Sequence, residues 1–242
     1  MAAILEPYKR LNIWEKVNRL RVFISGQKYF GEEVFDLCNK MDGVEVVGVC
    51  VPVGDRYLGR KARLYDVPII PAGSLNGDTM PDNVDLGITA HSFDYIGVKT
   101  RYRPRLGWIG YHPSLLPRHR GRSSIEWAIR MRDVVTGGTV FWLNAGIDRG
   151  DIAYQDWCFI EPRLFALPPR EAARELWQEK LQPMGLKLLE TAIKDILNGV
   201  IVRRPQDPAL STFEPNTDVK DVYKPDLLMI EEQASPSTSW YR

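Results

Sequence analysis

Two patterns of hydrophobic positions alternate along the chain. Residues 44–51 are almost wholly β-branched or apolar, which is typical of a strand buried on both faces of a parallel sheet. Residues 20–25 form a similar apolar run. Between the two runs, apolar side chains recur on one face of an amphipathic helix at Phe30, Val34, Leu37, Cys38 and Met41, and Gly43 ends it. Strand, helix and strand in this order predict a βαβ unit.

The same alternation continues along the chain. Short apolar runs predict strands at residues 67–70, 84–89, 106–112, 138–143 and 152–155. Residues 123–132 predict a helix that Ser123 or Ser124 could cap. Pro168 and Pro169 open the longest predicted helix, which extends to about residue 197. We therefore predict an α/β fold with an open, mostly parallel Rossmann-like sheet and helices on both of its faces.

Composition narrows the class of protein. The chain has 242 residues, 44% of them hydrophobic, and a formal net charge of +1, so it has the composition of a globular protein and no general nucleic-acid-binding field. Three widely spaced cysteines without a CxxC pair argue against a disulfide scaffold and against a zinc site, and Cys50 is expected to be a small buried hydrophobe. No signal peptide and no apolar run of about 20 residues is present, so we expect a cytoplasmic protein without a membrane span.

Candidate chemistry follows two of the predicted strands. His112 ends one strand and precedes a proline-bounded loop, and ligands of open α/β sheets bind at the carboxyl ends of strands. Gly146 and Gly150 bracket Asp148 after the next strand, so that a sharp turn presents the carboxylate. Either pattern alone is more often structural. A dinucleotide-binding hypothesis for residues 26–31 is weak, because their spacing is not GxGxxG.

Together, the two patterns are specific. Residues 111–121, Gly137-Gly138, Phe141-Trp142 and the turn at 146–151 resemble the formyltransferase family that uses 10-formyltetrahydrofolate. Within this family the pattern is most similar to the amino-terminal hydrolase domain of 10-formyltetrahydrofolate dehydrogenase. The resemblance covers residues 20–218, which we expect to form the catalytic domain. It leaves residues 1–19 as an N-terminal extension, which could be a short external helix, and residues 219–242 as a C-terminal tail or arm.

The resemblance implies a set of site residues. His112 and Asp148 would be the catalytic pair, acting on the formyl group and on the proton of the amine without a metal. The folate would be held largely by backbone groups of two segments, represented by Ile88, Ala90, His91, Ser92, Phe93, Asn144, Gly146 and Ile147. The acceptor side would be lined by Gly110, Ser114, Arg118 and Arg120.

Two departures from the family pattern matter. The family's transferases usually carry an asparagine two residues before the histidine, and this chain has Gly110 there. Loss of one oxyanion donor typically costs on the order of 10²–10³ in rate, so a water, a backbone N–H or another side chain would have to replace it. The β-rich C-terminal domain of methionyl-tRNA formyltransferase has no counterpart after residue 218, which argues against tRNA as the acceptor.

Three functions remain open at this point. The first is transfer of a formyl group from 10-formyltetrahydrofolate to the amine of a small acceptor. A basic stretch at residues 99–132 suggests that this acceptor is anionic or nucleotide-linked. The second is hydrolysis of 10-formyltetrahydrofolate to formate and tetrahydrofolate. The third, a non-catalytic folate-binding module, is disfavoured because both acid–base residues are present. The acceptor and the oligomeric state do not follow from the sequence.

Overall fold

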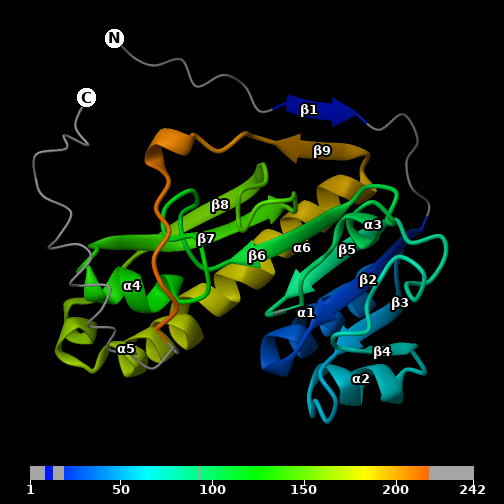
Figure 1. Ribbon diagram of the computed structural model, residues 1–242, viewed down its shortest axis with the longest axis horizontal. Helices are drawn as coiled ribbons and strands as arrows, with labels where there is room; N and C mark the ends of the chain where they lie inside the picture. The colour runs from blue at the N-terminus through cyan, green and yellow to red at the C-terminus, as the bar shows by residue number, and fades with distance from the viewer. Residues whose placement is uncertain (1–8, 13–18, 93, 218–242) are drawn as a thin grey trace, which may run out of the picture.

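The computed structural model describes residues 9–12, 19–92 and 94–217. Its centre is a seven-stranded sheet with the strand order β4-β3-β2-β5-β6-β7-β8 (Figure 1). The strands are β2 (Leu20–Gly26), β3 (Val44–Val51), β4 (Ile69–Pro71), β5 (Leu86–Ala90), β6 (Trp108–His112), β7 (Val135–Trp142) and β8 (Ile152–Phe159). β2 to β6 pair in parallel, whereas β7 and β8 pair antiparallel. The predicted open, mostly parallel α/β sheet is confirmed.

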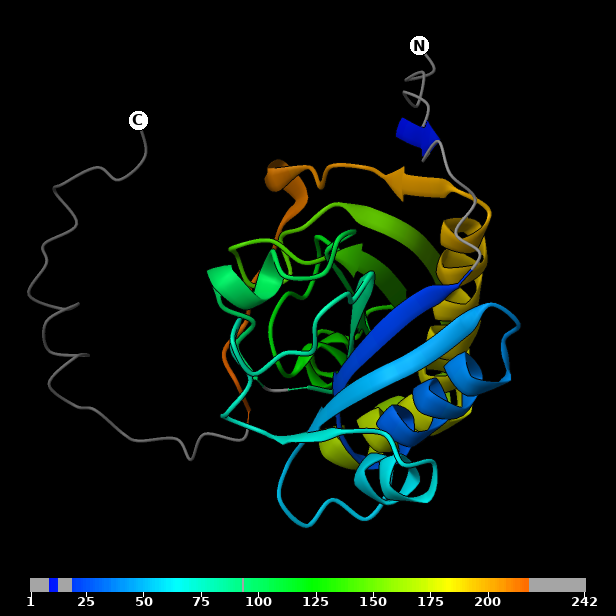
Figure 2. The same ribbon diagram turned by 90° about the vertical axis from the view of Figure 1, so that its right-hand side faces the viewer.

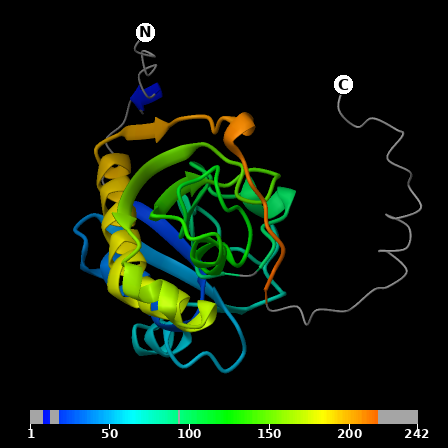
Figure 3. The same cartoon turned by 90° about the vertical axis from the view of Figure 1, so that its left-hand side faces the viewer.

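One face of the sheet carries the main hydrophobic core. It is covered by α1 (Lys28–Lys40) and α6 (Gln182–Leu197), and α2 (Leu58–Leu64) packs beside α1 (Figures 2 and 3). Ile24, Ile88 and Ile109 point from neighbouring strands into this core and are fully buried. Burying one such side chain contributes roughly 1.5–3 kcal/mol, so the apolar strands are stable only under the helices that cover them.

The other face is covered mainly by loops and by the short helix α3 (Val98–Arg101), which lies across the sheet from α6 (Figure 2). A second apolar cluster forms there around Phe23 and Trp108. Gly87 in β5 makes room for the indole, because a Cβ on Gly87 would lie 2.1 Å from the ring of Trp108. This face is therefore apolar toward the beginning of β6.

Toward the end of β6 the same face becomes polar. Ser25 is paired with Thr89, Thr89 with Gly110, and His112 with Thr139. Residues paired across neighbouring strands point to the same side of a sheet, and so do residues two apart along one strand. These residues thus form one polar row across four strands, on the face that the long helices leave uncovered.

The longest predicted helix has an interruption. It consists of α5 (Pro169–Leu176), a π-helical turn (Trp177–Leu181) and α6. Pro183 lies in the first turn of α6 and has no N–H to donate to the preceding turn, which accounts for the local change in hydrogen bonding. A 3₁₀ turn (Pro162–Ala166) precedes α5.

The predicted helix at residues 123–132 is α4 (Ser124–Arg130). Ser123 occupies its N-cap, but neither Ser123 nor Ser124 caps it with a side-chain hydrogen bond. The hydroxyl of Ser123 instead donates to Asn216 at 3.1 Å, because residues 204–217 pass over this end of the helix.

The N-terminal extension requires a correction. Residues 9–12, suggested as part of a short helix, form strand β1 (Lys9–Asn12), which pairs antiparallel with β9 (Val200–Arg203). The pairing partner lies about 190 residues later in the sequence, so no local pattern could indicate it. β9 and α2 were also not predicted from the sequence. Residues 1–8 and 13–18 of the extension and the tail at 219–242 lie outside the described residues.

After β9 the chain forms a segment that we call the strap, residues 204–217, which includes a 3₁₀ turn (Pro208–Leu210). The strap runs on the side of the sheet opposite α6 and is drawn in orange (Figures 2 and 3). It pairs with the loop after β6 through a bridge between Arg120 and Phe213. Within the described residues, no helix is long and apolar enough to cross a membrane.

Candidate active site

The two predicted catalytic residues lie next to each other. His112 is the last residue of β6 and is 7% exposed, and its Nδ1 lies 3.6 Å from Oδ2 of Asp148. Its Nε2 lies 2.7 Å from the backbone oxygen of His119. A carbonyl oxygen only accepts, so Nε2 carries a proton. Nδ1 is therefore the ring nitrogen available for chemistry, and it faces the carboxylate of Asp148.

Asp148 is held from three sides. Its backbone is left-handed, with φ of 51°, which is uncommon for a residue other than glycine. Its Oδ2 accepts a hydrogen bond from the backbone N–H of Gly121 at 2.8 Å. The side-chain amide of Gln206 donates to the carbonyl of Asp148 at 2.8 Å and to that of Gly150 at 2.7 Å. The strap thus fixes the turn that presents the carboxylate.

Arg120, predicted on the acceptor side, lies behind this turn. Its guanidinium donates from Nη2 and Nε to Oε1 of Gln206, at 2.7 and 3.2 Å. Burial and the charge of Arg149 lower the pKa of Arg120, and the charge of Asp148 opposes that shift. A chain of contacts therefore runs from Arg120 through Gln206 to Asp148.

Arg118 and His119 converge on one carboxylate. Arg118 donates from Nη2 and Nε to the two oxygens of Asp133, at 2.7 and 3.1 Å. His119 is buried between Asp133, 2.7 Å from its Nε2, and Glu214 of the strap, 3.1 Å from its Nδ1. Burial alone would raise the pKa of Asp133, but the hydrogen bonds and positive charges of Arg118 and His119 lower it. This cluster fixes the backbone oxygen that receives the hydrogen bond from His112.

Ser114 braces the same loop from inside. It is fully buried, and its hydroxyl donates to the carbonyl of Arg118 at 2.6 Å. The hydroxyl of Thr139, in the polar row, donates to the carbonyl of Ser114 at 2.6 Å. Of the four residues predicted on the acceptor side, Ser114, Arg118 and Arg120 are thus engaged by other parts of the protein.

The first predicted folate segment follows β5. Ile88 and Ala90 are buried, and the carbonyl of Ala90 accepts from the backbone N–H of Gln27 at 3.2 Å. The hydroxyls of Ser92 and Ser25 lie 2.9 Å apart. His91 packs edge-on against Trp177 and has a left-handed backbone, with φ of 57°. Burial, aided by the charge of Lys28, lowers the pKa of His91 to about 4. Phe93 lies outside the described residues.

The second predicted folate segment borders a cavity. Asn144 accepts a hydrogen bond from the backbone N–H of Gly146 at 2.9 Å, and the side chain of Ile147 is exposed. Beside this turn lies a cavity of about 570 Å³, within the usual range of small-molecule sites. Its lining combines aromatic, backbone and basic groups, among them Arg105, Trp108, Trp142, Asn144, Gly146 and Arg203.

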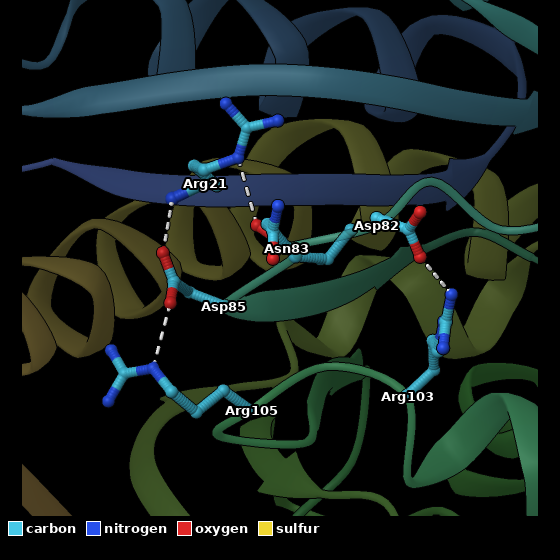
Figure 4. A pocket seen from close by; sticks show the side chains of 7 residues that line it. Arg21, Asp82, Asn83, Asp85, Arg103 and Arg105 are labelled. Carbon is cyan, nitrogen blue, oxygen red and sulfur yellow. Dashed lines mark hydrogen bonds and ion pairs between the residues drawn. The ribbon is translucent and has the colours of Figure 1, made fainter.

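A second cavity of about 560 Å³ adjoins the first, since Arg105 lines both, and it lies where β2 and β5 begin (Figure 4). The backbone N–H of Arg21 and Nε of Arg105 donate to the two carboxylate oxygens of Asp85, both at 2.9 Å. Arg103 pairs with Asp82. The three arginines of this cavity pair with the carboxylates of Glu45, Asp82 and Asp85, so their charges are already compensated and we assign no reaction to this cavity.

Sequence reasoning missed Gln206, because it lies in a segment without periodicity and acts only through the fold. It also missed the contacts of His119, although this residue stands inside the recognised motif. The partner residues Asp133 and Glu214 belong to other elements, so their roles became visible only in the structure.

Comparison with known proteins identifies the class to which this arrangement of sheet and site belongs. Residues 75–166 match a family model described as formyl transferase. Cytosolic 10-formyltetrahydrofolate dehydrogenase of Mus musculus is 34% identical over 209 residues, which cover 81% of this chain. Methionyl-tRNA formyltransferase of Acidobacterium capsulatum is 35% identical over 112 residues, covering 46% of this chain and 33% of that protein. The predicted resemblance is confirmed: the chain carries a formyl transferase domain.

Solved structures agree on the fold. Glycinamide ribonucleotide transformylase 1 from Symbiobacterium toebii superposes with a TM-score of 0.61 at 18% identity, covering 80% of this chain and 99% of that one. An N-formyltransferase from Helicobacter canadensis, solved with folinic acid and dTDP-3-aminofucose, gives 0.65 at 16% identity, covering 83% and 72%. The chain spans only 22% of the length of the mouse dehydrogenase.

Proposed function

We propose that this protein transfers a formyl group from 10-formyltetrahydrofolate to the amine of a small acceptor, with His112 and Asp148 as the catalytic pair. The observation that carries the proposal is their contact at the end of β6, where Nδ1 of His112 lies 3.6 Å from the carboxylate of Asp148. General acid–base catalysis needs such a pair beside the reacting atoms.

The two residues suit the proton balance of the reaction. The amine nitrogen bonds to the formyl carbon, and the formyl oxygen gains negative charge. The bond between that carbon and N10 of the folate then breaks, so N10 gains a proton while the amine loses one. Nδ1 of His112 can donate a hydrogen bond to the oxyanion or deliver the proton to N10. Asp148 accepts the amine proton through a water, because Gly121 binds only its Oδ2.

The cavity beside Asn144 supports a folate donor. The exposed ring of Tyr102 in its lining can pack on a pterin ring, and the backbone of residues 144–148 offers both donors and acceptors to the ring edge. Arg101, Arg105 and Arg203 of the same lining would attract the carboxylates of the folate's glutamate tail. The donor is a substrate here, so no resident cofactor is required.

A small acceptor is supported by the folds compared above. Structures named for glycinamide ribonucleotide and for a dTDP-linked amino sugar share this fold, and both names describe small anionic molecules. The arginines of the loop after β6 would suit such an acceptor, although Arg118 and Arg120 also make internal contacts. We therefore propose an anionic or nucleotide-linked amine.

Hydrolysis is a second candidate, which the dehydrogenase relatives favour. Several 10-formyltetrahydrofolate dehydrogenases are 30–34% identical to this chain across 81% of its length. In this reaction water takes the place of the amine, and Asp148 accepts a proton from that water. The products are formate and tetrahydrofolate.

The test measures tetrahydrofolate and formate formed from 10-formyltetrahydrofolate, with and without amino-sugar nucleotides or phosphoribosyl amines. We expect His112→Ala and Asp148→Asn to lower kcat by about 10²–10⁴. Asp42→Asn is the control, because it makes the same chemical change at an exposed carboxylate in the turn before β3, outside the proposed site. Amine-dependent turnover without formate supports transfer, and formate release without an amine supports hydrolysis. Undiminished turnover in both pair variants would refute the assigned roles.

A further inference from the structure

Gly110, which precedes His112 by two residues in the polar row, lies where there is no room for a side chain. A Cβ on Gly110 would lie 2.3 Å from the hydroxyl oxygen of Thr89, a distance that real Cβ atoms do not adopt. The next atom, Cδ1 of Leu143, would lie at 3.1 Å and belongs to the end of a flexible side chain. Gly110 and Thr89 are thus coupled: the hydroxyl occupies the space where a side chain at position 110 would begin.

Thr89 points to the same side of the sheet as His112. It is paired with Gly110 in the parallel register of β5 and β6, and His112 follows Gly110 by two residues on the same face. Strands lie about 4.8 Å apart and rise about 3.3 Å per residue, so such diagonal neighbours are about 8 Å apart at their Cα atoms, which leaves an oxygen atom between them within reach of both side chains.

The hydroxyl of Thr89 is available, unlike its neighbours in the row. Ser25 is engaged with Ser92, and Thr139 with Ser114. Thr89 is only partly buried, and among the described residues its hydroxyl has no hydrogen-bond partner. A threonine hydroxyl carries one proton that it can donate to an anionic oxygen.

We propose that Thr89 is a catalytic residue whose hydroxyl donates a hydrogen bond to the formyl oxygen as that oxygen becomes negatively charged. It thereby supplies, from β5, the donor that the side chain at position 110 of β6 does not supply. The proposal rests on the proposed function. The second donor to the same oxygen is Nδ1 of His112, so two strands contribute one donor each.

The first experiment compares Thr89→Val with Thr89→Ser. Valine keeps the shape and removes the donor, so we expect kcat to fall by about 10²–10³ with little change in KM. Serine keeps the hydroxyl, so we expect kcat within about tenfold of the wild type, since one rotamer constraint is lost. Thr136→Val, a buried threonine elsewhere in the sheet, is the matched control and should leave kcat unchanged. A Thr89→Val enzyme within threefold of wild-type kcat would overturn the proposal.

A second experiment moves the donor to the neighbouring strand. Thr89→Ala removes the atom that blocks position 110, so Thr89→Ala/Gly110→Asn can accept the new side chain, whereas Gly110→Asn alone meets the hydroxyl. We expect the double variant to exceed the kcat of Thr89→Ala at least tenfold. A folded double variant no more active than Thr89→Ala would contradict the donor role.

Binding of folinic acid, followed by calorimetry, separates this proposal from the proposed function. A wild-type protein that neither binds folinic acid nor consumes 10-formyltetrahydrofolate refutes the function itself. A wild-type protein that does both, with kcat insensitive to Thr89→Val, refutes only the role of Thr89. Thr89→Val should bind folinic acid about as tightly as the wild type, because the proposed bond strengthens only as the oxygen becomes anionic.

Discussion

A substitution in the strap tests whether Gln206 positions Asp148. Gln206→Glu keeps an oxygen that Arg120 can bind and removes the two N–H groups that anchor the carbonyls of Asp148 and Gly150. The new carboxylate oxygen also faces both carbonyls, which repel it. The variant therefore loosens the catalytic turn without leaving the buried guanidinium unpaired.

The size of the effect follows from the two lost bonds. Each contributes a net of about 0.5–1.5 kcal/mol, so the closed turn loses about 1–3 kcal/mol relative to open forms. If Asp148 acts only when the turn is closed, this shift lowers the competent population by up to about 5- to 150-fold. We expect kcat to fall within that range while folinic acid affinity changes less, because the Gln206 side chain anchors only the end of the turn, at the carbonyls of Asp148 and Gly150.

Steady-state kinetics of tetrahydrofolate formation measures this effect. Gln178→Glu makes the same chemical change at an exposed position of the π-helical turn and serves as the control for charge. A melting temperature near that of the control shows that the fold is retained. Wild-type kcat in a folded Gln206→Glu protein would show that the strap does not position Asp148, and the reasoning would be refuted.

Two further predictions concern stability. The pKa of His91 is about 4 in the folded protein and about 6.5 in the unfolded chain, so only the unfolded chain takes up a proton between these values and stability falls as the pH drops below 6.5. Urea unfolding at pH 7 and pH 5 measures the effect. Between these pH values the free energy of unfolding of His91→Asn should fall by about 1–2 kcal/mol less than that of the wild type, and asparagine tolerates the left-handed backbone of this position. An equal fall in both proteins would contradict the lowered pKa of His91. Gly87→Ala should lower the melting temperature by about 2–12 °C, because the methyl group overlaps the ring of Trp108. Gly97→Ala should leave the melting temperature unchanged, because the nearest atom to a Cβ at this position is 3.8 Å away. Equal melting temperatures for the two variants would refute this prediction.

The sequence predicted those elements whose burial is encoded locally. β3 is apolar at almost every position because helices and loops cover both of its faces, and its predicted limits match the structure. α1 follows the one-sided spacing of Phe30, Val34 and Cys38, which all face the core. The contact between His112 and Asp148 was also predictable, since both motifs belong to one recognised family pattern.

The strap and β1 could not be predicted, because their structure depends on distant partners. Gln206 and Glu214 lie among prolines and polar residues without periodicity, and each acts on a loop about 60 to 95 residues away in the sequence. The same holds for β1, which exists only as the partner of β9. Local patterns indicate burial by regular elements nearby in the sequence. The strap instead contacts distant loops through its side chains, and β1 pairs with a distant strand.

Gly110 shows why a departure from a family motif is hard to interpret from the sequence. The missing side chain suggests a lost donor, yet the structure shows that another side chain occupies its space. Two glycines of the central strands leave space for a side chain of the neighbouring strand. Gly87 makes room for the indole of Trp108, and Gly110 makes room for the hydroxyl of Thr89. Since Gly87 pairs with Trp108 and Thr89 with Gly110 in the same register, each glycine lies opposite the larger residue of the neighbouring strand. The chemical groups at the end of β6 therefore depend on both β5 and β6. The effect of a substitution in β6 can be interpreted only together with the residue that it faces in β5.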